Sequence, residues 1–211
     1  VAMDVGWRKV EKGIRVACWH GSDGNYGSII IPNEYLARWK KVEDLQSIRS
    51  KNYNDILPIF VKWLKSNVKL VPEWLRARIT TISHWRSNSQ NKLASILIQW
   101  RDNHFSGDEK IFETLESWRK QDKHLYDWQE SQRKNNIRWR DYFYRQEILA
   151  LRNSYAEIGF EDLNWANLQK GKNPEEVDLV NNTNRNVASV GRFLEVVKET
   201  GAATKLDAKN S

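Results

Sequence analysis

The chain has 211 residues, a formal net charge of +7 and an isoelectric point near 9.4. This length allows one substantial domain or two small ones, and the basic balance suggests a polyanionic partner. Cys18 is the only cysteine, which excludes an internal disulfide and a cysteine-based zinc site, and no apolar run is long enough to cross a bilayer, so we expect a cytoplasmic protein without a membrane partner.

The first 31 residues predict a three-stranded antiparallel meander. Apolar runs typical of strands occur at Val1–Val5, Ile14–Trp19 and Gly27–Ile31. The charged segment Arg8–Gly13 and a glycine-rich segment after Trp19 separate these runs and predict turns. Connections this short favour hairpins, and Pro32 is expected to end the third strand.

The middle of the chain has helical periodicity. Helices are predicted from Asn33, as the cap, to about Ile48, at Asn54–Ser66, from Pro72, at Ser89–Asp102 and at Lys110–Leu151. Ser106-Gly107-Asp108 is the plainest break. The last helix is long, so it is expected either to break near Gln121-Asp122 or to stand out from the body. Most of five tryptophans are expected in the core: Trp39, Trp63, Trp74, Trp100 and Trp118.

The C-terminal part returns to strands. A strand is predicted at Glu157–Leu163, a mobile polar loop at Gln169–Asn184, and a helix at Asn184–Thr200 with Gly201 as its cap. Ala203–Leu206 is expected to start a further strand. A strand, a helix and a second strand in this order imply parallel pairing.

Two acidic residues follow short apolar runs at opposite ends of the chain. Asp4 follows Val1-Ala2-Met3, and Glu161 and Asp162 follow a run that ends at Phe160. Side chains alternate along a strand, so only one of the two adjacent acids faces a given site, and ligands bind beyond the carboxyl ends of parallel strands. We hypothesise that the two segments lie side by side and hold a divalent metal between Asp4 and Glu161. The alternative is that Asp4 caps a turn and Glu161 pairs with a surface arginine.

The segment Leu125–Arg145 alternates basic and aromatic side chains. Basic groups can track phosphates, and aromatic rings can stack on bases. The predicted nucleic-acid contacts are Arg133, Lys134, Arg138, Arg140 and Arg145, interleaved with Trp128, Trp139, Tyr142 and Phe143. The alternative is that the rings pack in a core and the charges are solvated. The four histidines are scattered without metal-ligand spacing, and Cys18 is expected to be buried and inert.

Both ends of the chain resemble a known family. Met3-Asp4-Val5-Gly6-Trp7-Arg8 and Ile14-Arg15-Val16-Ala17 resemble the first catalytic segment of the RuvC-like nuclease domain in type V CRISPR effectors and related transposon-encoded proteins. Ile158-Gly159-Phe160-Glu161-Asp162-Leu163-Asn164 is similar to their second segment. Residues 185–188 and 205–211 resemble the part of the family that lies directly beyond this second segment. The middle of the chain matches only as a basic, tryptophan-rich helical insertion.

The resemblance implies an α/β fold, an RNase H-like, RuvC-type mixed sheet with a large helical insertion. It implies segments at 1–32 (β-meander), 33–150 (insertion) and 151–211 (strand, loop, helix, strand). Asp4 corresponds to the first metal-binding aspartate and Glu161 to the catalytic glutamate, holding Mg²⁺ or Mn²⁺. The third aspartate has no counterpart, because Asp207 matches a structural segment, and Asp162 is expected to point away from the metal.

The function expected from this resemblance is metal-dependent phosphodiester hydrolysis by an RNA-guided DNA-targeting effector, once a third acid completes the site. Guide RNA and target DNA are the expected partners, in a prokaryotic or phage cytoplasm, and the chain is expected to be part of a larger polypeptide. Two alternatives remain open: guide-dependent DNA binding without cleavage, and a helical interaction protein with no nucleic-acid role.

Overall fold

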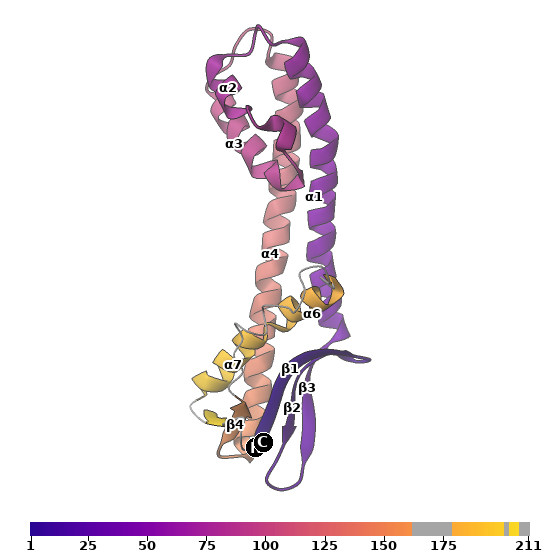
Figure 1. The fold of residues 1–211 in the computed structure, drawn as a ribbon, viewed down its shortest axis with the longest axis vertical. Helices are drawn as coiled ribbons and strands as arrows, with labels where there is room; N and C mark the ends of the chain where they lie inside the picture. The colour runs from indigo at the N-terminus through magenta and orange to yellow at the C-terminus, as the bar shows by residue number, and fades with distance from the viewer. Residues whose placement is uncertain (162–178, 201–202, 207–211) are drawn as a thin grey trace. The chain divides into compact units, whose positions relative to one another are not determined.

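A computed structural model describes residues 1–161, 179–200 and 203–206 (Figure 1). The chain divides into two compact units, Val1–Lys40 with Arg133–Ser211 and Lys41–Gln132. The elements in chain order are β1 (Ala2–Val10), β2 (Gly13–His20), β3 (Tyr26–Pro32), α1 (Asn33–Ser66), α2 (Glu73–Arg78), 3-10 turns η1 (Ile82–His84) and η2 (Ser87–Ser89), α3 (Gln90–Arg101), α4 (Glu109–Ser154), β4 (Ile158–Glu161), α6 (Leu179–Ala188), α7 (Val190–Glu199) and β5 (Ala203–Leu206).

The first unit contains a mixed sheet with the strand order β3-β2-β1-β4-β5. The pairs β1–β2 and β2–β3 are antiparallel, whereas β4 is parallel to β1 and β5 is parallel to β4. The predicted meander, the parallel return of the chain and the strand at Ala203–Leu206 are therefore confirmed. The fold is mixed α/β.

The first hairpin is longer than predicted. β1 continues to Val10, so the predicted turn at Arg8–Gly13 shrinks to Glu11 and Lys12. Gly13 makes this tight turn possible because its φ is +155° and a Cβ there would lie 1.8 Å from the carbonyl oxygen of Ile31. Apolar periodicity missed the extension because the paired residues beyond Gly6 are mainly charged.

Helix α1 is a single helix of 34 residues where two helices were predicted. Pro58 lies inside it and removes one backbone hydrogen bond without ending the helix. Asn33 does not cap the helix as expected. Its side chain accepts a hydrogen bond from Lys9 Nζ (2.9 Å) and donates one to the carbonyl oxygen of Glu11 (2.7 Å), which ties the start of α1 to the β1–β2 turn.

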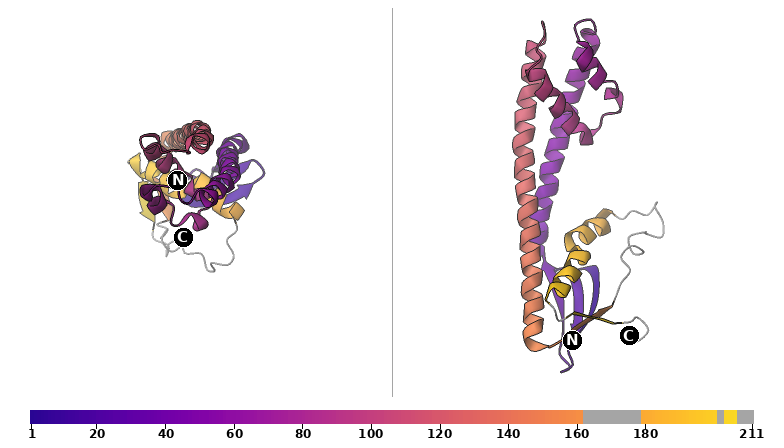
Figure 2. Two further views of the ribbon diagram at one scale, coloured as in Figure 1. Left: turned by 90° about the horizontal axis from the view of Figure 1, so that it is seen from above. Right: turned by 90° about the vertical axis from the view of Figure 1, so that its left-hand side faces the viewer.

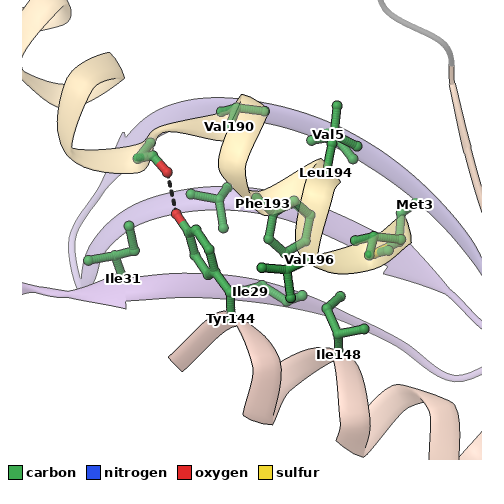
Figure 3. Packing of buried hydrophobic residues seen from close by; sticks show 14 of the residues in the cluster. Met3, Val5, Ile29, Ile31, Tyr144, Ile148, Val190, Phe193, Leu194 and Val196 are labelled. Carbon is green, nitrogen blue, oxygen red and sulfur yellow. Dashed lines mark hydrogen bonds between the residues drawn. The ribbon is translucent and has the colours of Figure 1, made fainter. Parts of the chain in front are cut away.

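One face of the sheet is covered by apolar side chains from α4 and α7 (Figure 3). Tyr144 and Ile148 of α4 and Phe193 of α7 are fully buried. They belong to one cluster with side chains of the strands and of α7, among them Met3, Val5, Ile29, Ile31, Val190, Leu194 and Val196. The core of the first unit therefore lies between this face of the sheet and helices α4 and α7.

The C-terminal helix is divided in two where a single helix at Asn184–Thr200 was predicted. α6 ends at Ala188, and α7 begins at Val190 after Ser189, whose φ of 43° is left-handed and cannot continue a helix. Residues 179–184, predicted to be loop, belong to α6. The rest of that loop, the end of the strand predicted at Glu157–Leu163, and Gly201 lie outside the described residues.

The second unit is helical and has its own apolar core. The side chains of Trp100 and Leu97 from α3, Phe60 from α1 and Leu75 from α2 are fully buried there. Trp118 is also buried, and Trp63 and Trp74 pack against this core, as Trp39 does against that of the first unit, so the predicted placement of these tryptophans is confirmed.

Helix α4 is continuous over 46 residues and does not break near Gln121-Asp122 (Figures 1 and 2). Gly107, with a φ of 86°, confirms the predicted break before it. In the part of the chain that is described, no helix has the length and hydrophobicity needed to span a membrane.

Asp108 organises the connection before α4. It is 1% exposed, and its Oδ2 accepts hydrogen bonds from Trp100 Nε1 (2.6 Å) and the backbone N–H of Phe105 (3.0 Å), while His104 Nδ1 lies 3.1 Å away. Burial alone would raise the pKa of Asp108. The hydrogen bonds from Phe105, Trp100 and His104 outweigh burial and lower this pKa below its usual value.

Asp108→Ala is expected to lower the free energy of unfolding by about 1–3 kcal/mol at neutral pH, because the Trp100 indole N–H would be buried without a partner. A lowered pKa means that the carboxylate stabilises the fold above its unfolded pKa, and this stability is lost as pH falls through the folded pKa. Urea unfolding between pH 7 and pH 2 should therefore show the two proteins converging at acid pH. A constant difference would contradict the assigned role of the carboxylate.

Candidate metal and nucleic-acid site

Asp4 lies on the face of the sheet opposite the core. Met3 and Val5 are each 4% exposed and join the apolar cluster, whereas Asp4 between them is exposed. Because successive residues of a strand point to opposite faces, the Asp4 carboxylate points away from α4 and α7. An acid at this position is accessible to solvent and to a ligand.

Strand β4 brings Glu161 to the register position beside Asp4. The parallel pairing of β1 and β4 matches Ala2 with Gly159 and Met3 with Phe160. One further step of the same register places Asp4 opposite Glu161, the last residue of β4. The prediction that these two segments lie side by side is confirmed, and what the two residues bind stays a prediction. Asp162 and Asp207 lie outside the described residues.

A polar cavity of about 150 Å³ opens beside Asp4. It is lined by residues of β1 and β2: Asp4, Gly6, Trp7, Arg8, Arg15, Val16, Ala17 and Cys18. Between the pairs Val5–Ala17 and Arg8–Arg15, two residues of β1 oppose one of β2, which is a β-bulge. Bulges are common next to functional sites, where they redirect side chains.

Cys18 belongs to the same row of the sheet as Asp4. It is matched with Asp4 on one side and with Ser28 of β3 on the other. The expectation of a buried, inert thiol is wrong in its first part, because Cys18 is half-buried and its Sγ lies 3.6 Å from Ser28 Oγ. On the face of the sheet opposite the core, the small side chains of Cys18 and Ser28 therefore lie in the same row as Asp4.

Two neighbouring carboxylates suit Mg²⁺, which takes oxygen ligands and is often held by one or two carboxylates plus water and substrate phosphates. Asp4 is exposed, and Glu161 is the last residue of the strand that pairs in parallel with β1. Within the described ranges there is no group of three histidine, cysteine or acidic residues that could hold a metal ion. Asp4 therefore offers one exposed carboxylate, and a metal site at this position would need further acids.

The predicted basic residues of α4 divide into exposed and structural ones. Arg133, Lys134 and Arg138 are exposed. Lys134 and Arg138 are four residues apart, so they lie on the same side of the helix, where one phosphate backbone can contact both. These are the positions of α4 that remain candidates for nucleic-acid contact.

Arg140 has a structural role that the sequence did not reveal. It is 7% exposed, and its Nη1 donates to the carbonyl oxygens of Val187 (3.1 Å) and Asn186 (3.3 Å) at the end of α6. The Tyr144 hydroxyl donates to the next carbonyl, that of Ala188. A cation at a helix C-terminus is favourable, so Arg140 caps α6 and is a poor candidate for binding a phosphate.

Arg145 takes part in an ion-pair network between α4 and α7. Its Nη2 lies 2.9 Å from Glu199 Oε2. Arg192 of α7 contacts the same glutamate at 2.9 Å and Asp141 of α4 at 3.0 Å. Hydrogen bonds from Arg192 to Glu195 and Glu199 hold the pKa of the guanidinium above its ordinary value. A phosphate at Arg145 would have to compete with Glu199.

The aromatic residues of Leu125–Arg145 also divide into rings that pack within the fold and rings that are exposed. Trp139 stacks on Tyr35 with ring centroids 4.4 Å apart and on Phe143 at 5.2 Å, so these rings pack within the first unit. Tyr142 is 62% exposed and Trp128 is 41% exposed. Lys41 Nζ lies 4.9 Å from the Trp128 ring centroid, a cation–π contact.

Sequence reasoning missed Arg8 and Arg15 as members of the site. Both residues line the cavity beside Asp4. The sequence pattern predicts a turn at Arg8 and a strand at Arg15, and it predicts no function for either. The available signal was Gly6, since a glycine inside a strand often marks a bulge or a close approach of another group.

No protein-family model matches the chain. It is 34% identical over 195 residues to the CRISPR-associated DNA-binding protein Cas12m of Thermanaerosceptrum fracticalcis, which covers 91% of this chain and 32% of that protein. A protein of the same name from Allomeiothermus silvanus is 34% identical over 164 residues, covering 78% and 30%. One from Mycolicibacterium mucogenicum is 26% identical over 185 residues, covering 80% and 30%. The chain spans about a third of the length of the curated relatives it matches.

Proposed function

We propose that this chain is the RuvC-like portion of a type V CRISPR effector that binds DNA under the direction of a guide RNA. The observation that carries this proposal is the 34% identity, over most of the chain, to two bacterial proteins whose name states DNA binding. The net charge of +7 has the sign that a nucleic-acid partner requires.

The sheet supports the RNase H-like, RuvC-type assignment. An antiparallel meander is joined through its first strand to two parallel strands, in the order β3-β2-β1-β4-β5. The long segment between β3 and β4 is helical, as an insertion into such a sheet would be. The two strands that carry Asp4 and Glu161 are neighbours near the middle of the sheet.

The protein's part in DNA recognition would be to hold the backbone. In RNA-guided binding, base pairing with the guide reads the sequence, and protein side chains contact phosphates and sugars. Exposed Lys134 and Arg138 on α4 supply cations for this purpose, and Arg133 lies beside them.

A second candidate function is metal-dependent cleavage of the bound DNA, and the register of Asp4 with Glu161 favours it. The two carboxylates would hold Mg²⁺ or Mn²⁺ together with an acid from another part of the effector. The ion, when bound, would activate water and neutralise the leaving oxygen of a phosphodiester. The strands would keep the two carboxylates in place while the exposed face admits the DNA.

The proposal is tested by measuring binding of the complete effector to a labelled DNA duplex, with a matching guide, with a mismatched guide and without a guide. Affinity should require the matching guide and should fall linearly on a log–log plot as salt is raised. Binding that ignores the guide, or that does not weaken with salt, would contradict the proposal. A complete lack of binding would favour the helical interaction protein.

The double variant Lys134→Gln, Arg138→Gln is expected to reduce the slope of log affinity against log salt by about two, because each phosphate contact contributes about 0.9. Its melting temperature should stay close to that of the wild type, since both side chains are exposed. Arg140→Gln should instead lower the melting temperature. A double variant with the wild-type salt slope would remove these residues from the interface.

A further inference from the structure

Arg8 and Arg15 face each other across the first hairpin. They are directly matched residues of β1 and β2, on the far side of the bulge from Asp4. Matched side chains of antiparallel strands stand about 4.5–5.5 Å apart at Cβ, and like charges at such positions destabilise a sheet. The neighbour of Arg15 on β3 is Ile30, which supplies no compensating charge.

Neither guanidinium forms an ion pair with a carboxylate of the described residues, including Asp4 beside them. Elsewhere in the first unit, arginines that are only partly buried form such pairs, as Arg145 and Arg192 do with Glu199. Two adjacent guanidinium groups that form no ion pair with a described carboxylate, on one wall of a cavity, create a local field that attracts an anion.

The cavity itself has room for the anion. Gly6 lies on its wall between Asp4 and the arginines, and a Cβ added at Gly6 would meet no atom within 4 Å. A glycine with open space in front of it lets another backbone approach the sheet closely. Guanidinium groups bind phosphate oxygens in a planar, bidentate arrangement, so a pair of them suits a phosphodiester.

We infer that Arg8 and Arg15 form a clamp for backbone phosphates of a nucleic-acid strand, next to the Asp4–Glu161 position. This inference rests on the proposed function and adds to it a positioning site for the strand. The phosphates neutralise the two guanidinium charges, and the strand they hold runs past the carboxylate of Asp4. The shared chemistry is a phosphodiester backbone, which either the target DNA or the guide RNA supplies.

The test compares the wild type with Arg8→Gln, Arg15→Gln and the double variant in the complete effector. The matched control is Lys12→Gln, which removes one positive charge from the exposed turn of the same hairpin, outside the cavity. Salt titrations are recorded in two arms: guide RNA binding to the protein, and DNA duplex binding to the guide-loaded protein. Melting temperatures without nucleic acid are measured in parallel.

We expect the double variant to lose about two from the salt slope in one arm, which corresponds to roughly 3-fold in affinity per phosphate between 50 and 200 mM salt. Loss in the DNA arm assigns the phosphates to the target, and loss in the RNA arm assigns them to the guide. The melting temperature should stay equal or rise, because removing like charges relieves repulsion. Wild-type slopes in both arms, or a slope change no larger than that of Lys12→Gln, would overturn the clamp while leaving guide-dependent binding intact. A wild type that binds neither nucleic acid would overturn the clamp together with the proposed function.

Discussion

Replacing Asp4 with Asn is expected to weaken Mg²⁺ binding by the complete effector by more than about 100-fold. An amide has the shape of the carboxylate but lacks the charge that this hard cation requires. Substitutions one layer outside a metal's ligands already cost about 10- to 100-fold in affinity, and a direct ligand matters more. Glu161→Gln should act in the same direction, because Glu161 directly follows Phe160, the residue of β4 that is matched with Met3.

The measurement is the melting temperature as Mg²⁺ is added, which does not depend on cleavage. An ion that binds only the native state stabilises it by about 2.7 kcal/mol at 100 times its dissociation constant, and this gain should disappear in both variants. Asp55→Asn is the matched control, since Asp55 is exposed on α1 and the charge change is the same. Equal Mg²⁺ shifts in all four proteins would refute the assignment, as would Mg²⁺-dependent DNA cleavage that persists in both variants.

Asp122→Ala is expected to destabilise the helical unit by about 3–5 kcal/mol, because it leaves a buried arginine without its partner. Arg49 and Asp122 have side chains only 5% and 9% exposed, and Arg49 Nε and Nη2 donate to the two carboxylate oxygens at 2.8 and 3.0 Å. Arg49 Nη1 also donates to Gln129 (3.0 Å), and its guanidinium lies 4.9 Å from the Tyr126 ring centroid. The pair thus links α1 to α4 at a position where both charges are largely withdrawn from water.

The control is the exposed ion pair Lys123–Asp127 on the same helix, with side chains 61% and 56% exposed. Asp127→Ala should cost less than about 1 kcal/mol, as exposed pairs usually do. The double variant Arg49→Met, Asp122→Leu should regain most of the lost stability, because buried ion pairs are often replaceable by apolar residues of similar volume. Chemical unfolding measures all three. A loss in Asp122→Ala as small as in Asp127→Ala would show that the buried pair is solvated.

Local patterns predicted the strands better than the helix ends. Alternation and short apolar runs located β2, β3 and β5, because a strand with one buried face repeats every two residues. The mostly polar stretch Ser50–Asn54 was interpreted as a helix end, yet α1 passes through it because Tyr53 within it is fully buried in the core of the second unit. Tertiary packing overrides a weak local signal in such places.

The site residues that follow a local sequence pattern were identified from the sequence. The roles of residues that depend on contacts with segments far away in the sequence could not be identified in this way. Asp4 and Glu161 follow apolar runs, and parallel pairing then brings the two strands together. Arg138 and Arg140 have the same local setting in the sequence, but the end of α6 lies against Arg140, and its carbonyl oxygens accept the hydrogen bonds of that guanidinium. The cavity beside Asp4 depends on a bulge, which shifts the β1–β2 register by one residue and leaves little trace in composition.

The parallel pairing of β1 with β4 sets an order for folding during synthesis. β1 can pair with β2, and β2 with β3, once the chain has been synthesised as far as Pro32. The other edge of β1 pairs with β4, where the N–H of Gly159 donates to the carbonyl oxygen of Val1 (2.8 Å). At about 5–20 residues per second, the ribosome delivers that partner on the order of 10 s later. During that interval the second unit has time to form. The edge of β1 that carries Met3 and Val5 is still unpaired then, and another chain or a chaperone can bind to it.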